Sequence, residues 1–173
     1  DRPHINILLV GAGAERARLV ENAKARDLRN VHFLQPQPKE RMPAVWSVCD
    51  VALVHLKNSE VFAGVIPSKI FEAMGMGLPI LFAGPEGEAS RIIESSGAGL
   101  CVAPENPDTL ADAIIWLASE PGMRRRLAEA SVNAAPSYSR ETQARRMMDV
   151  LERVVAGRGG EVSNIRSNTG ATS

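Results

Sequence analysis

Short apolar runs alternate along most of the chain with segments in which apolar residues recur at helical spacing. The first run, INILLVG at residues 5–11, is almost wholly apolar, which is typical of a strand buried in a parallel sheet. In the segment that follows, Leu19 and Ala23 share one face and charged residues lie between them, which predicts a helix over 14–28. Further strands are expected at 31–35, 51–56, 79–84 and 98–103, and further helices at 38–49, 67–77, 87–97, 106–121, 121–135 and 139–157.

Strands that alternate with helices indicate a parallel sheet, because parallel neighbours need a long crossover between them. We therefore predict an α/β, Rossmann-like fold with helices on both faces of the sheet. Residues 1–156 are assigned to one domain. Residues 157–173 contain too few apolar side chains to offset the entropy of ordering, so a disordered tail is expected there.

Composition limits the class of protein. The 173 residues are 45% hydrophobic and 23% charged, which is ordinary for a soluble globular domain. Twenty basic and twenty acidic side chains cancel, so the chain carries no electrostatic signal for binding nucleic acid. No apolar run approaches the roughly twenty residues that span a bilayer, so any membrane contact is expected to be peripheral. Cys49 and Cys101 lie in or beside apolar segments, which indicates buried thiols in a reducing compartment.

Candidate chemistry is concentrated in IPSKIFEAMGMGLPI, residues 66–80. Ligands of parallel α/β sheets bind at the carboxyl ends of the strands, and the loop at 57–68 is the longest expected there. A helix beginning near Ser68 places Lys69 in its first turn, where the helix dipole disfavours a cation unless an anion is bound. Glu72 lies on the same face, and its carboxylate can accept hydrogen bonds from two vicinal hydroxyls. The pair therefore predicts a phosphate and ribose site.

The same two residues also fit an interpretation without a ligand. Lys69 and Glu72 at this spacing can form an exposed ion pair worth about a few tenths of a kcal/mol. A glutamate near the start of a helix is favourable without any ligand. These residues alone do not separate the two interpretations. Gly77 is expected to end the helix ahead of Leu78 and Pro79.

A family resemblance adds to this pattern. The segment GVIPSKIFEAMGMGLPILFAG, residues 64–84, closely resembles the signature of retaining, nucleotide-sugar-dependent glycosyltransferases of the GT-B type, group 1 or family four. Residues 10–56 and 87–114 look like the carboxyl-terminal, donor-binding domain of that family. The PSKIFEAMGMG version is most similar to members that build bacterial surface polysaccharides. The resemblance extends from about residue 5 to about residue 155.

The resemblance implies an activity, partners and a location. It implies transfer of a hexosyl group from a nucleoside diphosphate sugar to an acceptor sugar or a lipid-linked sugar. The enzyme is then expected in the cytoplasm, or peripherally at the inner face of the cell membrane. Residues 1–156 become a nucleotide-sugar-binding domain, and the isolated chain need not be active.

The resemblance also implies roles for individual residues. Glu72 corresponds to the second glutamate of the family's paired-glutamate motif and would bind the donor ribose, and Lys69 would contact the donor diphosphate. The other implied donor-binding positions are Ser68 in the first turn, Gly64, Val65 and Ile66 through their backbone, Phe33 and Gln35 beside the base, and Gly11 and Gly13 in the first loop. For Gly11, a tight strand-to-helix turn without ligand contact explains the residue equally well.

Two departures from the family pattern alter the expectation. The first glutamate of the motif would fall at Gly64, so we expect no direct carboxylate contact to the transferred sugar. The family also has an amino-terminal acceptor domain, a further first strand and an arginine that assists Lys69. This chain begins after all three, so it is expected to be the donor-binding part of a larger enzyme.

No metal or other cofactor is expected, because His4, His32 and His55 are scattered and no ligand spacing is present. His32 and His55 either face the cleft or are satisfied core histidines. Two other functions remain open on the sequence: a nucleotide-binding module without turnover, and a GT-B-like nucleotide-sugar epimerase. The nucleotide base, the sugar and the acceptor are left open.

Overall fold

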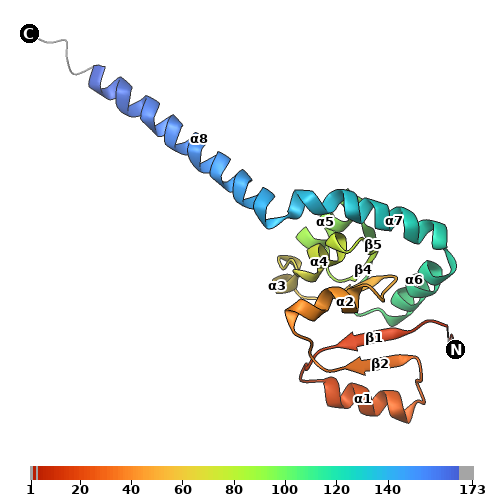
Figure 1. The fold of residues 1–173 in the computed structure, drawn as a ribbon. Helices are drawn as coiled ribbons and strands as arrows, with labels where there is room; N and C mark the ends of the chain where they lie inside the picture. The colour runs from red at the N-terminus through yellow and green to blue at the C-terminus, as the bar shows by residue number, and fades with distance from the viewer. Residues whose placement is uncertain (1, 3, 168–173) are drawn as a thin grey trace, which may run out of the picture.

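The computed structural model describes the backbone of residue 2 and residues 4–167, and side chains as far as residue 156 (Figure 1). The strands are β1 (Ile7–Val10), β2 (Val31–Leu34), β3 (Ala52–His55), β4 (Ile80–Ala83) and β5 (Gly99–Val102). The helices are α1 (Arg16–Ala25), α2 (Met42–Trp46), α3 (Glu60–Ala63), α4 (Lys69–Gly75), α5 (Glu88–Ser96), α6 (Pro107–Ser119), α7 (Pro121–Ala134) and α8 (Arg140–Ser167), with 3₁₀ turns η1 (Lys39–Arg41) and η2 (Ala135–Tyr138). Every strand and helix expected from the sequence has its counterpart.

The strands form two parallel sheets rather than the single sheet that the sequence predicts. β1 pairs only with β2, in a register that sets Ile7 opposite Val31. β3, β4 and β5 form the other sheet in that order, with Ala52 opposite Ile80. Within the described residues no strand pairs with both β1 and β3, so the two sheets are not joined by hydrogen bonds. The predicted α/β fold with parallel strands is confirmed, and its division into two sheets is a correction.

β4 is the centre of the core, because all four of its residues are buried. Successive side chains of a strand point to opposite faces of the sheet. Ile80 and Phe82 belong to one apolar cluster with residues of α4 and α5, and Leu81 packs on the other face with Leu117 of α6 and Leu127 of α7. Helices therefore cover both faces of the three-stranded sheet, as predicted.

The helix that holds the candidate site ends where the sequence predicts. α4 stops after Gly75, and Gly77 adopts the left-handed conformation with a φ of 68°, which glycine reaches without steric cost. The backbone then enters β4. One element is additional: the loop at 57–68, expected to be irregular, contains the single helical turn α3.

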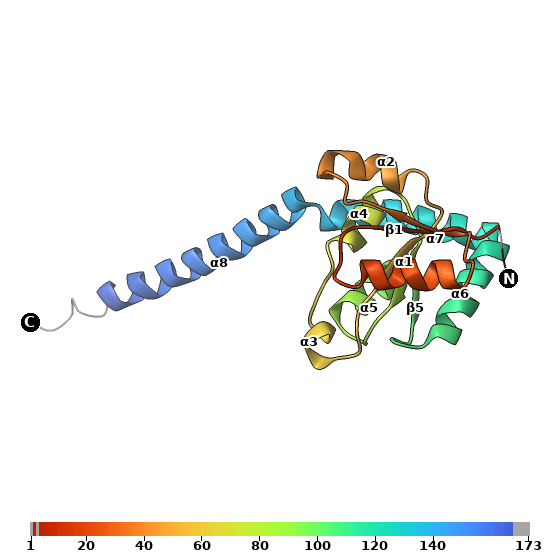
Figure 2. The same cartoon turned by 90° about the horizontal axis from the view of Figure 1, so that it is seen from below.

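The last helix, α8, projects from the body of the molecule (Figures 1 and 2). It continues to Ser167, so the expected boundary at residue 156 does not coincide with the end of a helix. The remainder of the expected tail, 168–173, lies outside the described residues. Among the described residues, no helix is both long enough and apolar enough to cross a membrane.

Candidate functional site

Lys69 and Glu72 lie together on the solvent side of α4. Ile70, Ala73 and Met74 of the same helix are fully buried in the core. Residues three apart share a face, so burial of one side of the helix leaves Lys69 and Glu72 exposed on the other. Because α4 connects two parallel neighbours, β3 and β4, it begins at the carboxyl end of β3. The sequence prediction of one shared exposed face is confirmed by this geometry.

The interpretation of Lys69 and Glu72 as a mutual ion pair is not supported. The side chains described up to residue 156 form ion pairs between Arg18 and Glu15, Arg29 and Asp27, Arg91 and Glu88, and Arg145 and Glu141. The Glu72 carboxylate instead accepts a hydrogen bond from the hydroxyl of Ser68, with 3.3 Å between Oγ and Oε1. Ser68 therefore contacts the Glu72 carboxylate, and among the side chains described up to residue 156 the ammonium group of Lys69 forms no ion pair.

The chain ahead of α4 is fixed by α3 and by the loop after β4. The amide of Val65 donates to the carbonyl of Phe62 at 3.2 Å, so that amide is already used within the turn. Gly64 and Ile66 are exposed beside it. The backbone of Gly87, at the start of α5, approaches the backbone of Ala63 so closely that a Cβ at Gly87 would lie 2.8 Å from the Ala63 carbonyl carbon. The position of residues 64–66 therefore depends on Gly87.

A second group of predicted residues lies at the carboxyl ends of β1 and β2. Gly11 has a φ of 147°, and its amide donates to the carbonyl of Leu34 at 3.3 Å. That bond brings Gly11 beside Gln35, whose own carbonyl accepts a hydrogen bond from the side chain of Gln37. A Cβ at Gly11 or at Gly13 would meet no atom within 4 Å, so the space above this turn is open. Gly11 is thus explained by its turn, and a ligand contact remains a prediction.

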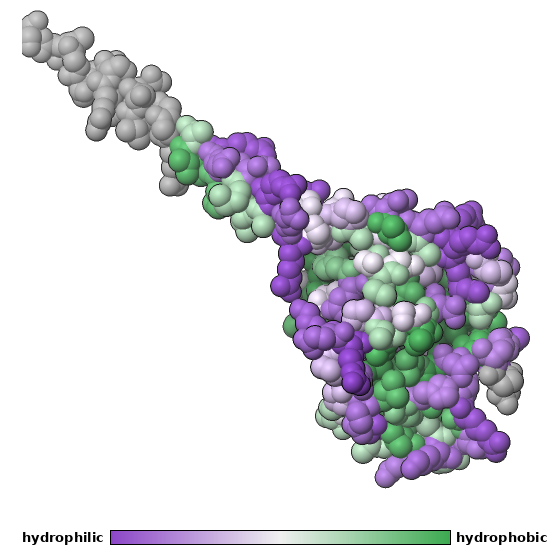
Figure 3. Space-filling model, in the orientation of Figure 1, coloured by the Kyte–Doolittle hydropathy of each residue, from purple (hydrophilic) through white to green (hydrophobic). Residues whose placement is uncertain are grey.

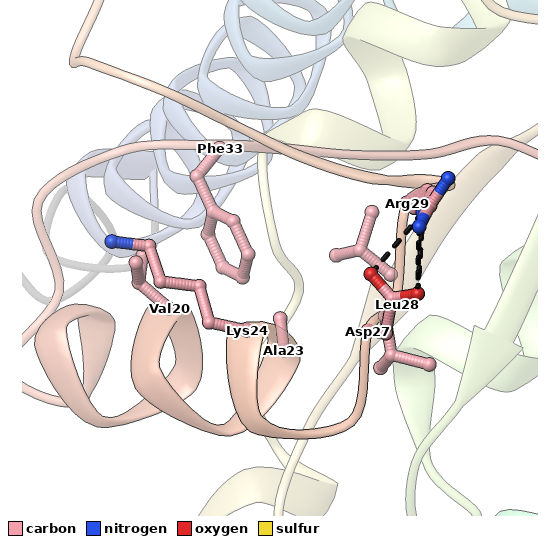
Figure 4. Close-up of a pocket in the computed structure, with 8 residues that line it drawn as sticks. Val20, Ala23, Lys24, Asp27, Leu28, Arg29 and Phe33 are labelled. Carbon is pink, nitrogen blue, oxygen red and sulfur yellow. Dashed lines mark hydrogen bonds and ion pairs between the residues drawn. The ribbon is translucent and has the colours of Figure 1, made fainter.

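Phe33 is not brought together with these residues. Its side chain points between β2 and α1 and lines an open hollow of about 330 Å³ (Figure 4). The other lining residues are Val20, Ala23, Lys24, Asp27, Leu28, Arg29 and Val31. This hollow lies between α1 and one face of the two-stranded sheet, whereas the predicted donor-binding residues lie at the carboxyl ends of the strands. Phe33 has a packing role there, and its position beside a base remains a prediction.

A smaller hollow, of about 290 Å³, lies at the carboxyl ends of β3, β4 and β5. His55 and Lys57 stand at its border, and both are exposed, so His55 is not a core histidine. Glu105, also at this border, has a φ of 54°, which is rare for a residue with a side chain. Lys57 and Glu105 were not singled out from the sequence. Their only sequence signal is their position just after predicted strands.

The surroundings of the two cysteines disfavour the thiolate form. Burial raises the pKa of Cys101 to about 12, and the nearby carboxylate of Glu94 adds to that rise. Burial also raises the pKa of Cys49, with a further contribution from Asp50. The thiolate is the reactive form of cysteine, so both shifts lower the reactivity of these side chains near neutral pH. Both cysteines are free, and each is half-buried rather than buried as the sequence predicts.

Comparison with known proteins defines the family. Residues 1–133 match the family model described as Glycosyl transferases group 1. D-inositol 3-phosphate glycosyltransferase of Corynebacterium urealyticum is 29% identical over 143 residues, which are 81% of this chain and 32% of that protein. The putative colanic acid biosynthesis glycosyl transferase WcaI of Escherichia coli is 33% identical over 116 residues, which are 66% of this chain and 28% of that protein. The chain therefore spans about a third of the length of the curated relatives it matches.

Solved structures share the fold. HepE of Anabaena, in complex with UDP-glucose, has a TM-score of 0.70 at 23% identity, over 87% of this chain and 42% of that chain. Sucrose-phosphate synthase of Thermosynechococcus elongatus has a TM-score of 0.71 at 23% identity, over 87% of this chain and 38% of that chain. These are GT-B glycosyltransferases, and the likeness shows the fold. Because the family model takes in well over half of the chain, the protein belongs to the group 1 glycosyltransferases.

Proposed function

We propose that this chain is the donor-binding part of a retaining hexosyltransferase. The enzyme would transfer a hexosyl group from a nucleoside diphosphate sugar to an acceptor sugar or a lipid-linked sugar. The observation that supports this most directly is the exposed face of α4, where Lys69 and Glu72 stand at the carboxyl end of β3. Among the side chains described up to residue 156, neither forms an ion pair with another.

Each residue of the α4 face has a distinct part in this proposal. The departing diphosphate gains negative charge in the transition state. A cation that is already fixed beside it stabilises that state by about several kcal/mol, as preorganised hydrogen-bond donors do in other enzymes. Lys69 provides that cation. Glu72 accepts hydrogen bonds from the two ribose hydroxyls, and the hydroxyl of Ser68 fixes the carboxylate for that purpose. Gly64 offers no carboxylate to the transferred sugar.

The biological setting is also a proposal. The similarity to WcaI, named for colanic acid biosynthesis, supports a role in building a bacterial surface polysaccharide. A lipid-linked acceptor would bring the enzyme to the inner face of the cell membrane from the cytoplasm. The acceptor would be bound largely by an amino-terminal domain, because this chain spans 28–32% of the curated relatives named above.

Binding of nucleotides by matched variants tests the assignment. The ligands are UDP, GDP, uridine, guanosine, UDP-glucose and GDP-mannose, titrated by calorimetry. Lys69→Ala is expected to weaken diphosphate binding at least about tenfold, which is about 1.4 kcal/mol, and nucleoside binding much less. Glu72→Gln is expected to weaken both, because the ribose is common to both. Lys24→Ala and Glu21→Gln, exposed residues of the same types on α1, serve as controls.

Two results would contradict the assignment. If Lys69→Ala weakens nucleoside and diphosphate binding equally, Lys69 does not contact the diphosphate. If Glu72→Gln behaves like Glu21→Gln, the ribose contact lies elsewhere. The alternative of a binding module without turnover is separated by activity: the full natural protein then binds a nucleotide sugar without transferring or epimerising it.

A further inference from the structure

Arg16 is the one charged residue on the buried side of α1. Within Arg16–Ala25, the residues that are not exposed are Arg16, Val20 and Ala23. Their spacing is that of neighbours on one face, so they form a single stripe along the helix. Val20 and Ala23 line the hollow that Phe33 enters, so this stripe faces the two-stranded sheet (Figure 4). Arg16 therefore lies on the sheet side of the first turn.

The guanidinium group of Arg16 is partly buried and lacks a partner for its inner nitrogen. The Nε atom is buried and has no hydrogen-bond partner among the described residues. The nearby arginines are paired, Arg18 with Glu15 and Arg29 with Asp27, whereas Arg16 takes part in none of the ion pairs described up to residue 156. A cation that loses water without gaining a partner is unfavourable. This arrangement therefore indicates an acceptor that comes from outside the chain.

The first turn of α1 stands at the carboxyl ends of β1 and β2. These strands are parallel neighbours and α1 connects them, so the helix begins where β1 ends. The amide of Arg16 donates to the carbonyl of Gly13 at 3.0 Å, which joins the helix to the glycine loop. A Cβ at Gly11 or at Gly13 would meet no atom within 4 Å. Arg16 thus adjoins open space at the edge where parallel α/β sheets bind ligands.

The chemistry of a guanidinium limits what it can recognise. It offers only donors, and its planar fork matches a ligand with two adjacent acceptors. A nucleotide has two such groups: a phosphate, through two of its oxygens, and guanine, through O6 and N7. Adenine places an amino donor beside N7, and the corresponding edge of uracil has one acceptor, O4. Among these bases, guanine alone can therefore accept two hydrogen bonds from one arginine on this edge.

The position of Arg16 favours the base over a phosphate. Arg16 belongs to the two-stranded sheet, whereas Lys69 and Glu72, proposed to hold the diphosphate and the ribose, follow a strand of the other sheet. The surface over β1 and β2 is largely apolar, and Leu34 at the end of β2 remains 40% exposed (Figure 3). An apolar side chain suits the flat face of a base, and it offers no hydrogen bond to a phosphate.

We propose that Arg16 is a specificity-determining residue that selects guanine, so that the donor is a guanosine diphosphate sugar. This inference rests on the proposed function. Lys69 and Glu72 would contact the diphosphate and the ribose, which all nucleotide sugars share, so neither residue distinguishes one base from another. Arg16 would supply that distinction by donating to O6 and N7. One bidentate contact of this kind discriminates between bases by about 5- to 150-fold.

Calorimetric titration of matched nucleotides into the full natural protein tests the selection. The ligands are GDP, inosine diphosphate, 7-deaza-GDP, ADP, UDP and inorganic pyrophosphate. Inosine diphosphate keeps both O6 and N7, whereas 7-deaza-GDP has a carbon in place of N7. GDP and inosine diphosphate are expected to bind at least about tenfold more tightly than ADP or 7-deaza-GDP.

Variants of the arginine connect this preference to one side chain. Arg16→Met keeps an unbranched apolar stem and is expected to weaken GDP and inosine diphosphate at least about tenfold, with 7-deaza-GDP, ADP and pyrophosphate changing less than about threefold. Arg16→Lys keeps the charge without the planar fork, so it is expected to lose the preference for GDP over 7-deaza-GDP as well. Arg18→Met, an exposed position on the same helix, is the matched control and is expected to change none of these affinities. Urea denaturation confirms that each variant is folded.

The outcomes separate this inference from the proposed function. If Arg16→Met weakens every nucleotide and pyrophosphate equally, and Arg16→Lys restores them, Arg16 contacts a phosphate and the selection of guanine is overturned. If Arg16→Met lowers stability but leaves the order of affinities unchanged, Arg16 is structural and the inference is again overturned. In both cases, nucleotide binding that still depends on Lys69 and Glu72 leaves the proposed function intact. Failure of every nucleotide to bind the natural protein would overturn the proposed function, and with it the inference.

Discussion

Gly87→Ala is expected to disturb the candidate donor site without touching any residue proposed to bind the donor. Gly87 has a φ of 173°, which is extended backbone that alanine also adopts. The cost of the substitution therefore comes from contact alone. A Cβ would overlap the carbonyl oxygen of Ala63, and it would lie 2.8 Å from the carbonyl carbon and 3.1 Å from the Cα of that residue, closer than the contact distance of about 3.5–4.0 Å between carbon atoms.

The atoms that must move are backbone atoms of Ala63 at the end of α3, so relief requires a shift of that turn by about 1 Å or more. Overpacking of this kind destabilises proteins by about 1–3 kcal/mol. α3 leads directly into residues 64–66, ahead of Lys69, so the shift is transmitted to the proposed phosphate-binding segment. Misplacement of about 1 Å at a binding site can reduce activity by on the order of 100-fold.

The assay combines urea denaturation with calorimetric titration of UDP. Gly87→Ala is expected to lower the free energy of unfolding by about 1–3 kcal/mol and to weaken UDP binding in the remaining folded protein. Gly122→Ala is the matched control, because a Cβ there meets no atom within 4 Å and the first turn of α7 favours alanine by up to about 1 kcal/mol. Unchanged stability and affinity in Gly87→Ala would refute the described contact between α5 and α3.

Three other variants probe the packing beneath the site. Ser131 is fully buried, and its hydroxyl donates to the backbone carbonyls just ahead of β4 and β5. Ser131→Ala is therefore expected to lower the free energy of unfolding in urea by about 1–3 kcal/mol, whereas substitution of the exposed Ser119 by alanine is expected to change it by less than about 0.5 kcal/mol. Equal effects of the two substitutions would contradict the buried hydrogen bonds. Tyr138 stacks on Phe71 of α4 with 5.2 Å between the ring centroids. Tyr138→Leu is therefore expected to lower the free energy of unfolding, followed by thermal denaturation, by about 0.5–1.5 kcal/mol. An unchanged midpoint of denaturation would argue against the stack. The pKa of Cys101 is about 12 in the folded protein against 9.0 for an exposed thiol, so folded Cys101 keeps a proton that the unfolded chain releases. The contribution of Cys101 to the free energy of unfolding in urea is therefore expected to be constant below pH 9 and to fall from there towards pH 12, so stability should fall less steeply over that range in Cys101→Ala. A parallel decline in both proteins would contradict this cause.

Local signals predicted the elements well because those signals are short-range. The apolar runs located all five strands, and the glycine at position 77 located the end of α4. The spacing of Lys69 and Glu72 predicted their shared exposed face, since the core-facing positions of the same turn are apolar. The sequence does not predict the four residues of α3 as a helix, because a single turn has no recurring pattern.

Long-range features could not be predicted from those signals. Pairing of strands depends on neighbours that are distant in sequence, so the division into two sheets had no local sign. The direction of Phe33 depends on which face of β2 receives α1, which the alternation of a four-residue strand leaves open. The contact of Gly87 with Ala63 likewise joins the start of α5 and the end of α3, which only the fold brings together.

Lys69 and Glu72 are exposed because of how α4 packs on the core, and not because of any contact between the two side chains. α4 has seven residues, and its three fully buried side chains, Ile70, Ala73 and Met74, fix its rotation about its own axis. A rotation by one position would turn a charged side chain towards the core and an aliphatic one towards water, at a cost of about several kcal/mol. The stack of Phe71 on Tyr138 holds the same rotation from the side of η2. Lys69 and Glu72 are therefore presented at the carboxyl edge whether or not a donor is bound, and a ligand there would not have to turn the helix.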